Sequence, residues 1–415
     1  MKWFGAFLYL IVCCLLLEVI KSFVAKQEYI SSYFVGTLLI CLQFFCLLGF
    51  VLFLLVSFLM KKIRGRGSWA VSLTIVLGCF AILELGAAWM LNRPSSIPSS
   101  MKPAVYYYYD HYNTPLPQFN VAAAVYNKQL FYTLRPDAQF RYANLEFDNQ
   151  YHTNSKGIRD QEEALIRPAV ICLGDSYAMG WGVEQAETYA RHVGKLSGLS
   201  TLNAGVSSYG TAREMIMLDQ LDTSTLQFLI IQYCYNDLGE NKASIAHQYK
   251  LPISGEGNYD TLVARQRLLD RYFPGKYGLL LSQVGLKYAV NHVKPIFSMQ
   301  QERASGFGNE KEHAAAFVDI LYHAPRINFR KVKVLVTLLD SYDHLSCRFL
   351  DEVTRLAAQS PYAEHFGGNL QVVNMHGLLQ PDDFYELDLH IRASGHQKVA
   401  ERLWQQMSGK SSDSR

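Results

Sequence analysis

The stretch AVICLGDSYAMGWGV, residues 169–183, decides how the rest of the chain is interpreted. Its first five residues are apolar and partly β-branched, which is typical of a strand buried on both faces of a parallel sheet. Gly174, Asp175 and Ser176 end that strand abruptly, and the small residues that follow permit tight turns and close approach of a substrate. A serine at this place points into the crevice where open α/β sheets bind ligands. Gly-Asp-Ser is also a common turn sequence, so Ser176 needs support from elsewhere in the chain.

The 415 residues divide into an apolar amino-terminal part and a near-neutral remainder. The first 100 residues contain eight Lys or Arg and three Asp or Glu, which leaves 31 basic and 33 acidic residues for the rest. Because this remainder has no excess of positive charge, we expect no nucleic-acid partner. Cys172, Cys234 and Cys347, the three cysteines outside the apolar part, have neither disulfide nor zinc spacing. No phosphate loop or dinucleotide fingerprint is present, so we predict no disulfide, no metal and no cofactor.

Three apolar runs precede the globular part, at residues 3–24, 33–60 and 69–91. Each reaches the ~20 residues needed to cross ~30 Å of hydrocarbon, so we expect three membrane spans. The first run could instead be a signal peptide, but it is long and no small-x-small cleavage site follows it. The basic cluster KKIRGR at residues 61–66 should stay in the cytoplasm. Everything after residue 91 is then extracytoplasmic, which in a bacterium means periplasmic beside the inner membrane.

Two carboxylates, Glu18 and Glu84, interrupt the first and third runs at similar depth. Intramembrane carboxylates are costly and are functional candidates by default. The favoured alternative is that each tilts to the interface or bonds a neighbouring helix.

After a Pro/Ser linker at residues 92–102, predicted strands alternate with predicted helices. This alternation predicts a three-layer α/β/α domain with a parallel sheet over residues 103–410. Residues 238–328 break the rhythm, and we interpret them as a helical insertion that forms a lid or a partner surface. The tyrosines at 106–109 could form a stacking platform for a sugar, although edge strands also use tyrosine heavily.

Three further stretches follow predicted strands, where the carboxyl edge of the sheet would gather them. Residues 203–210 supply exposed backbone N–H groups, Asn236 follows the third strand, and Asp388 and His390 precede the last helix. A serine hydroxyl needs a base to take its proton. A histidine base needs a carboxylate to fix its tautomer, and a tetrahedral oxyanion needs preorganised donors. These residue types therefore favour nucleophilic acyl chemistry.

With these motifs in order, the sequence resembles the SGNH (GDSL-type) hydrolase superfamily. It is most similar to the membrane-anchored bacterial members, in which TNSxGxR precedes the strand and GDSxxxGxGV follows it. The match covers residues 153–239 and 382–403. The resemblance implies that Ser176 is the nucleophile and first oxyanion donor, and that His390 is the base.

The same resemblance implies that Ser208 and Asn236 are the second and third oxyanion donors. The family usually has glycine where Ser208 stands, but a main-chain N–H can serve from serine if the backbone conformation is allowed. The family's carboxylate commonly lies three residues before the histidine, a place held here by Leu387. Asp388 lies two before and is favoured as the partner of His390, and Glu386 is the alternative.

Other polar residues near the predicted strand ends have weaker patterns. Asp237 is expected to bond a turn backbone, and Asp343 and His344 have no evident second ligand set.

The sequence thus predicts a membrane-anchored serine esterase, deacylase or O-acyltransferase that acts on an ester of a cell-envelope glycan or lipid through an acyl-serine. Hydrolysis and transfer share this intermediate, and the sequence leaves both open. The alternative is a catalytically silent SGNH-like module that binds or assembles with proteins of an envelope polysaccharide complex. The intact set of Ser176, Asn236 and His390 argues against that alternative.

Overall fold

The computed structural model describes most of the chain after the first 67 residues. The described ranges are 68–91, 116–143, 146–270, 275–278, 309–324, 327–385 and 388–409. The predicted spans at 3–24 and 33–60, Glu18 and the tyrosines at 106–109 lie outside them. The chain divides into two compact units, which are Met1–Asn113 with Arg271–Phe297 and Thr114–Asp270 with Ser298–Arg415.

In the first unit, helix α3 (Ser68–Leu91) corresponds to the third apolar run. Its Glu84 carboxylate accepts hydrogen bonds from the backbone N–H groups of Tyr277, at 3.2 Å, and Gly278, at 2.8 Å. Glu84 therefore bonds a second segment of the same unit, which agrees with the favoured interpretation of this residue.

Within the described residues, no helix is both long enough and apolar enough to cross a membrane.

The second unit is built on a five-stranded parallel sheet with the order β6-β5-β7-β8-β9. In chain order this is 2-1-3-4-5, so the direction of winding reverses between β5 and β7. Such a switch point is where doubly wound sheets bind ligands. The predicted parallel α/β sheet is confirmed. Its strands are β5 (Val170–Leu173), β6 (Thr201–Asn203), β7 (Phe228–Tyr233), β8 (Lys333–Leu338) and β9 (Leu370–Val372).

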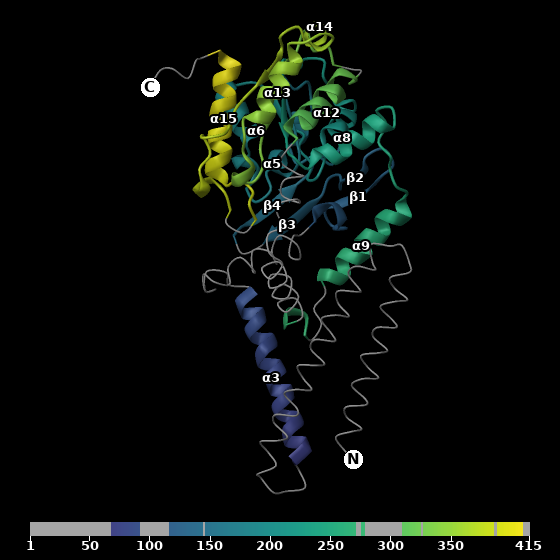
Figure 1. Ribbon diagram of the computed structural model, residues 1–415, viewed down its shortest axis with the longest axis vertical. Helices are drawn as coiled ribbons and strands as arrows, with labels where there is room; N and C mark the ends of the chain where they lie inside the picture. The colour runs from purple at the N-terminus through teal and green to yellow at the C-terminus, as the bar shows by residue number, and fades with distance from the viewer. Residues whose placement is uncertain are drawn as a thin grey trace. The chain divides into compact units, whose positions relative to one another are not determined.

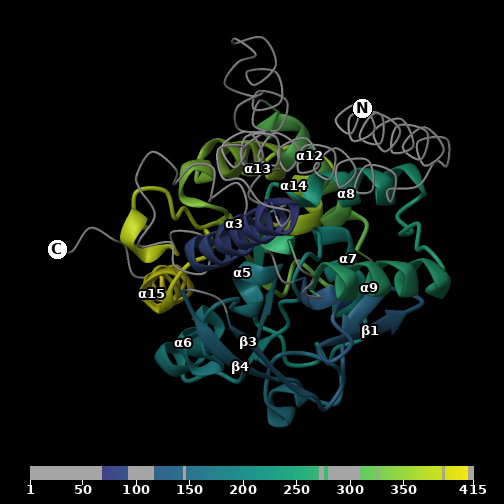
Figure 2. The same ribbon diagram turned by 90° about the horizontal axis from the view of Figure 1, so that it is seen from below.

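Helices cover both faces of this sheet. This follows from the packing of the strands, whose alternate residues point into two different hydrophobic cores. In β7, Leu229 and Ile231 pack in one core and Ile230 packs in the other, and all three are fully buried. Figure 1 shows α6 beside α15, and Figure 2 shows this pair apart from α8, α12 and α13. The layers are therefore α/β/α, as predicted. The helices are α5 (Ser176–Met179), α6 (Tyr189–Ser197), α7 (Thr211–Leu218), α8 (Asp237–Ala246), α12 (Glu310–Tyr322), α13 (Arg348–Ala357), α14 (Tyr362–Phe366) and α15 (Ala393–Ser408).

The tyrosine-rich region before the sheet forms two antiparallel hairpins. In the second hairpin, buried and exposed residues alternate along both strands, so one face packs on the core and the other faces water. The buried faces join the core that also holds α7 and α12. These strands are β1 (Ala124–Asn127), β2 (Phe131–Leu134), β3 (Gln139–Ala143) and β4 (Asp148–His152).

The stretch expected as an insertion, residues 238–328, is divided between layers and units. Helix α12 is a core helix whose Phe317 and Val318 are fully buried, and α8 packs against it and against α7. Helix α9 (Glu256–Asp270) belongs to the same unit. Residues Arg271–Phe297 group with the first unit instead. The broken rhythm therefore arises because the connection between β7 and β8 covers the sheet and also contributes to the other unit.

Candidate active site

The turn after β5 presents Ser176 as the first residue of the short helix α5. The Asp175 carboxylate accepts a hydrogen bond from the Tyr177 N–H at 3.0 Å and so caps that helix. Gln232 on β7 lies directly behind the turn and accepts from the Asp175 N–H at 3.0 Å. A Cβ on Gly174 would lie 2.6 Å from the Ala178 Cβ, and the φ of Gly174 is 149°, so this turn requires glycine. The sequence Gly-Asp-Ser therefore places the serine at the sheet's carboxyl edge.

A continuous chain of hydrogen bonds links Ser176, His390 and Asp388. The His390 Nε2 lies 2.7 Å from the Ser176 Oγ, and the His390 Nδ1 lies 2.5 Å from the Asp388 Oδ1. The two ring nitrogens thus face different partners, as a general base and its orienting carboxylate require. The structure brings together all three residues predicted for this role.

The two-residue spacing between Asp388 and His390 works because of Leu389. This residue has a left-handed backbone with a φ of 66°, a conformation that costs roughly 1–2 kcal/mol for an ordinary residue. The Tyr177 hydroxyl donates to the Leu389 carbonyl at 3.3 Å and supports the turn. The alternative carboxylate, Glu386, lies outside the described residues.

Burial and charge set the protonation of this chain. Burial disfavours the charged imidazole, but the Asp388 carboxylate outweighs it and raises the pKa of His390 above its ordinary value. Burial likewise opposes ionisation of Asp388, but His390 and a hydrogen bond from Trp181 lower the pKa of this carboxyl below its ordinary value. The pair is therefore arranged as a carboxylate that stabilises an imidazolium.

The two further predicted donors lie on loops that follow β6 and β7. Ser208 has a left-handed backbone with a φ of 60°, a conformation that glycine adopts without the steric cost that serine meets. Within the described residues its N–H donates to no protein acceptor. Asn236 begins α8 without capping it through its side chain. Burial raises the pKa of the Asp175 carboxyl to about 6, and Asn236 opposes this rise.

Two residues in the quoted motifs were given no role by the sequence. Trp181 donates from Nε1 to the Asp388 Oδ2 at 3.1 Å. Arg159, fully buried, donates to the Met179 and Val183 carbonyls at 3.1 and 2.7 Å and stacks on the Tyr151 ring at 3.9 Å. The signals were an arginine and a tryptophan inside otherwise small or polar motifs. Arg159 therefore fixes the loop that carries Trp181, and Trp181 holds the carboxylate.

Other polar candidates have structural partners. Asp237 accepts from the Thr211 N–H and hydroxyl, at 3.1 and 2.8 Å, and so holds the start of α7. His344 pairs with Asp340 at 3.0 Å. Across the described residues, no group of three or more His, Cys, Asp or Glu is placed to hold a metal ion.

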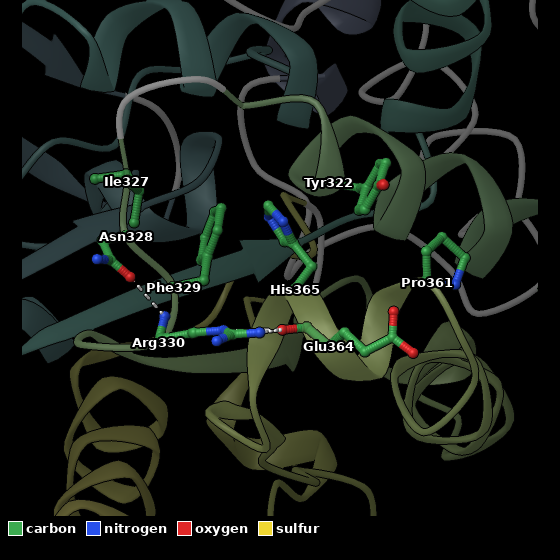
Figure 3. A pocket seen from close by; sticks show the side chains of 8 residues that line it. All are labelled: Tyr322, Ile327, Asn328, Phe329, Arg330, Pro361, Glu364 and His365. Carbon is green, nitrogen blue, oxygen red and sulfur yellow. Dashed lines mark hydrogen bonds between the residues drawn. The ribbon is translucent and has the colours of Figure 1, made fainter.

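A pocket of about 460 Å³ lies at the other edge of the sheet. Its lining includes residues 327–330, which lie just before β8 and therefore at the amino ends of the strands. Ser176, His390 and Asp388 lie instead at the carboxyl ends. Figure 3 shows the Arg330 side chain reaching the Glu364 backbone, with His365 between Phe329 and Tyr322. The Arg330 Nε and Nη2 donate to that carbonyl at 3.0 and 2.7 Å. This pocket is therefore separate from the predicted catalytic residues.

Comparisons with known proteins give structural neighbours only. No protein-family model matches the sequence, and no curated protein matches it. One similar solved structure is a "putative lipolytic protein of G-D-S-L family" from Desulfitobacterium hafniense DCB-2, with 11% identity, a TM-score of 0.28 and coverage of 57% of this chain and 97% of that one. Another is the lipase Lip_vut3 from a goat rumen metagenome, with 14% identity, a TM-score of 0.27 and coverage of 56% and 94%. The second unit has a five-stranded parallel sheet covered by helices on both faces, and its ordered Ser, Asn and His motifs resemble those of the SGNH hydrolases.

Proposed function

We propose that the protein is a serine esterase or O-acyltransferase that works through an acyl-serine on Ser176. One observation carries this proposal: His390 bridges Ser176 and Asp388 through its two different ring nitrogens, at 2.7 and 2.5 Å. A histidine that only stabilised the loop would not need to face a serine hydroxyl at the edge of the sheet.

The first half-reaction forms the acyl-enzyme. The Ser176 Oγ attacks the ester carbonyl carbon while its proton moves to the His390 Nε2, and the carbonyl electron pair moves onto oxygen. In this proposal the backbone N–H groups of Ser176 and Ser208 and the Asn236 amide donate to the oxyanion. The intermediate collapses when the ester C–O bond breaks, and His390 returns its proton to the leaving oxygen.

The second half-reaction decides between an esterase and a transferase. His390 takes a proton from water or from a sugar hydroxyl, the resulting nucleophile attacks the acyl carbon, and Ser176 leaves with the proton. Water gives a free acid, and a hydroxyl acceptor gives a new ester. The residues are the same in both cases, so the acceptor that reaches the acyl-serine determines the product.

The substrate class follows from the chain's predicted location. In the sequence, three apolar runs and the basic cluster at residues 61–66 favour an anchor in the inner membrane with the second unit on the periplasmic side, a placement that requires the third run, helix α3, to cross the membrane. Acylated glycans and lipids of the envelope are the esters available there. Alkaline phosphatase fused after Ser99 should be active, and a fusion after Arg66 should be inactive. The opposite pattern would contradict this placement.

A fluorophosphonate probe tests the chemistry on the detergent-purified full chain. We expect covalent labelling of the wild type and none of the Ser176→Ala variant. Unlabelled protein incubated with an acyl ester and a sugar acceptor would be assayed separately for free acid and for the acylated sugar, which separates hydrolysis from transfer. No labelling of a folded wild type would favour the catalytically silent assembly module.

A further inference from the structure

The peptide group between Ser207 and Ser208 is held from a distant part of the chain. Its N–H belongs to Ser208, a donor in the proposed oxyanion hole. Its carbonyl, on Ser207, accepts a hydrogen bond from the Tyr132 hydroxyl at 2.6 Å. Tyr132 lies on β2, is 3% exposed, and comes from the hairpin region that the family resemblance does not cover. The N–H and the carbonyl of a trans peptide group point in opposite directions, and here the carbonyl is bonded to a buried phenol.

Tyr132 is itself fixed by the loop that it holds. The Tyr209 hydroxyl donates to the Tyr132 backbone carbonyl at 2.6 Å, and the two rings pack edge to face with centroids 5.4 Å apart. The Arg213 guanidinium lies over both rings, at 5.3 and 5.1 Å, and pairs with Glu240. Tyr132 and Tyr209 thus join the hairpin to the loop through two hydroxyl–carbonyl hydrogen bonds, one donated from each side.

The inner side of the same loop rests on the turn that carries Ser176. The Val206 N–H donates to the Gly174 carbonyl at 3.0 Å. A Cβ on Gly205 would lie 2.3 Å from the Met179 nitrogen, so the loop backbone touches the backbone of α5. Residues 205–206 therefore cannot shift relative to the turn that carries Ser176. The peptide group between Ser207 and Ser208 could still rotate, and the hydrogen bond from Tyr132 opposes that rotation.

Backbone strain makes this restraint matter. Ser208 has a φ of 60°, a left-handed conformation that a non-glycine residue keeps only when its surroundings impose it. Rotation of the preceding peptide group would relieve the strain and turn the N–H away from the site. The Tyr132 hydroxyl opposes that rotation because the Ser207 carbonyl would lose its buried partner.

We propose that Tyr132 is a positioning residue of the oxyanion hole, whose hydroxyl orients and polarises the peptide group that presents the Ser208 N–H. A carbonyl that accepts a strong hydrogen bond withdraws electron density from its own amide, so the N–H becomes a better donor. Burial raises the pKa of Tyr132 well above its ordinary value, which keeps the phenol protonated as a donor. This inference rests on the proposed acyl-serine chemistry.

The first test compares Tyr132→Phe with Tyr189→Phe in the full chain. Tyr189 is also fully buried, but within the described residues its hydroxyl has no hydrogen-bond partner, so it controls for loss of a buried hydroxyl. On a short-chain aryl ester, Tyr132→Phe should lower kcat about 10- to 50-fold with KM within about twofold. Tyr189→Phe should change neither. A lower melting temperature with normal kcat would show a purely structural role and overturn the inference.

A second measurement reports on the oxyanion itself. Sulfur accepts hydrogen bonds poorly, so a preorganised hole favours an aryl ester over its thionoester. Tyr132→Phe should reduce this preference, while a mutation that only destabilises the fold should leave it unchanged. If Tyr132→Phe does not fold, Tyr209→Phe, which releases the Tyr132 backbone, should show the same reduced preference to a smaller extent.

Rescue sharpens the test. Ser208→Gly removes the penalty of the left-handed conformation while keeping the N–H, so it should restore part of the kcat lost by Tyr132→Phe. No restoration together with an unchanged thionoester preference would overturn the inference. A wild type that fails to label with the fluorophosphonate would instead remove the proposed function on which it rests, so the two failures are distinguishable.

Discussion

Two groups of Ser, His and Asp lie at the carboxyl edge of the same sheet, and only one has the geometry of a catalytic chain. In the first, His390 uses Nε2 for Ser176 and Nδ1 for Asp388. In the second, the Nδ1 of His344 faces both the Ser341 Oγ, at 2.9 Å, and the Asp340 Oδ1, at 3.0 Å. A proton taken from Ser341 would have to enter at the nitrogen that already faces the carboxylate.

The second group is built within five consecutive residues, whereas the first joins parts of the chain more than 200 residues apart. Asp340 also accepts from the Cys234 thiol at 3.2 Å and the Tyr235 N–H at 3.3 Å, so it ties the ends of β7 and β8 together. The comparison teaches that composition at the edge of a sheet does not identify a catalytic set. The assignment of the two imidazole nitrogens does.

The largest expected contrast is between the two serines. Ser176→Ala should lower the turnover of a short-chain aryl ester by about 10⁵-fold or more, because no other hydroxyl takes the acyl group. Ser341→Ala should leave kcat within about twofold. Steady-state turnover of the two purified variants, with melting temperatures to confirm folding, checks this. A large loss in Ser341→Ala and none in Ser176→Ala would reverse the comparison.

The carboxylates should differ next. Asp388→Asn should keep the fold but slow acylation by about 10⁴-fold, because an amide favours the wrong imidazole tautomer. Asp340→Asn should act mainly on stability, and Glu386→Gln should be nearly silent. Acylation rates from stopped-flow bursts would rank the three. A strong effect of Glu386→Gln beside a mild one of Asp388→Asn would give the orienting role to Glu386.

The pattern of residues predicted the sheet and brought its catalytic candidates to one edge, because buried strands and the residues that end them are local features. It assigned no role to Trp181 or Tyr132, since their hydrogen bonds join segments 207 and 75 residues apart. It also treated the 238–328 stretch as one insertion. Helix α12 looks like any amphipathic helix until the sheet provides the apolar face that buries Phe317. Contacts that depend on tertiary structure were therefore the ones that the sequence did not supply.

The oxyanion donors extend the comparison, because the resemblance assigns the Asn236 amide to the Ser176 group and no such donor to the Ser341 group. Asn236→Ala should lower kcat by about 10²–10³-fold, roughly 3–4 kcal/mol, with KM and melting temperature little changed. Asn236→Asp provides a matched variant of the same size that places a negative charge beside the oxyanion and should be at least as slow. Loss of folding in both variants would mean that Asn236 is structural.

The smallest expected effect concerns Trp181. Its indole N–H donates a hydrogen bond to Asp388, whereas Asp340 in the second group accepts from the Cys234 thiol and the Tyr235 N–H. His390 must be neutral to act as a base, so kcat/KM should rise with pH through the pKa of His390, which lies above its ordinary value. Trp181→Phe removes a hydrogen bond that stabilises the charged carboxylate, so Asp388 becomes more basic and holds the imidazolium more tightly. The midpoint of the pH profile should then move upward, and kcat/KM below that midpoint should fall about three- to tenfold.

Asp388→Asn removes the main interaction that raises the pKa of His390, so its midpoint should move downward. Trp404→Phe, on α15 and away from His390, is the matched control and should leave the profile unchanged. The measurement is kcat/KM from pH 5 to 9 for all four proteins. Equal midpoints in wild type and Trp181→Phe would show that the Trp181 bond only packs the loop.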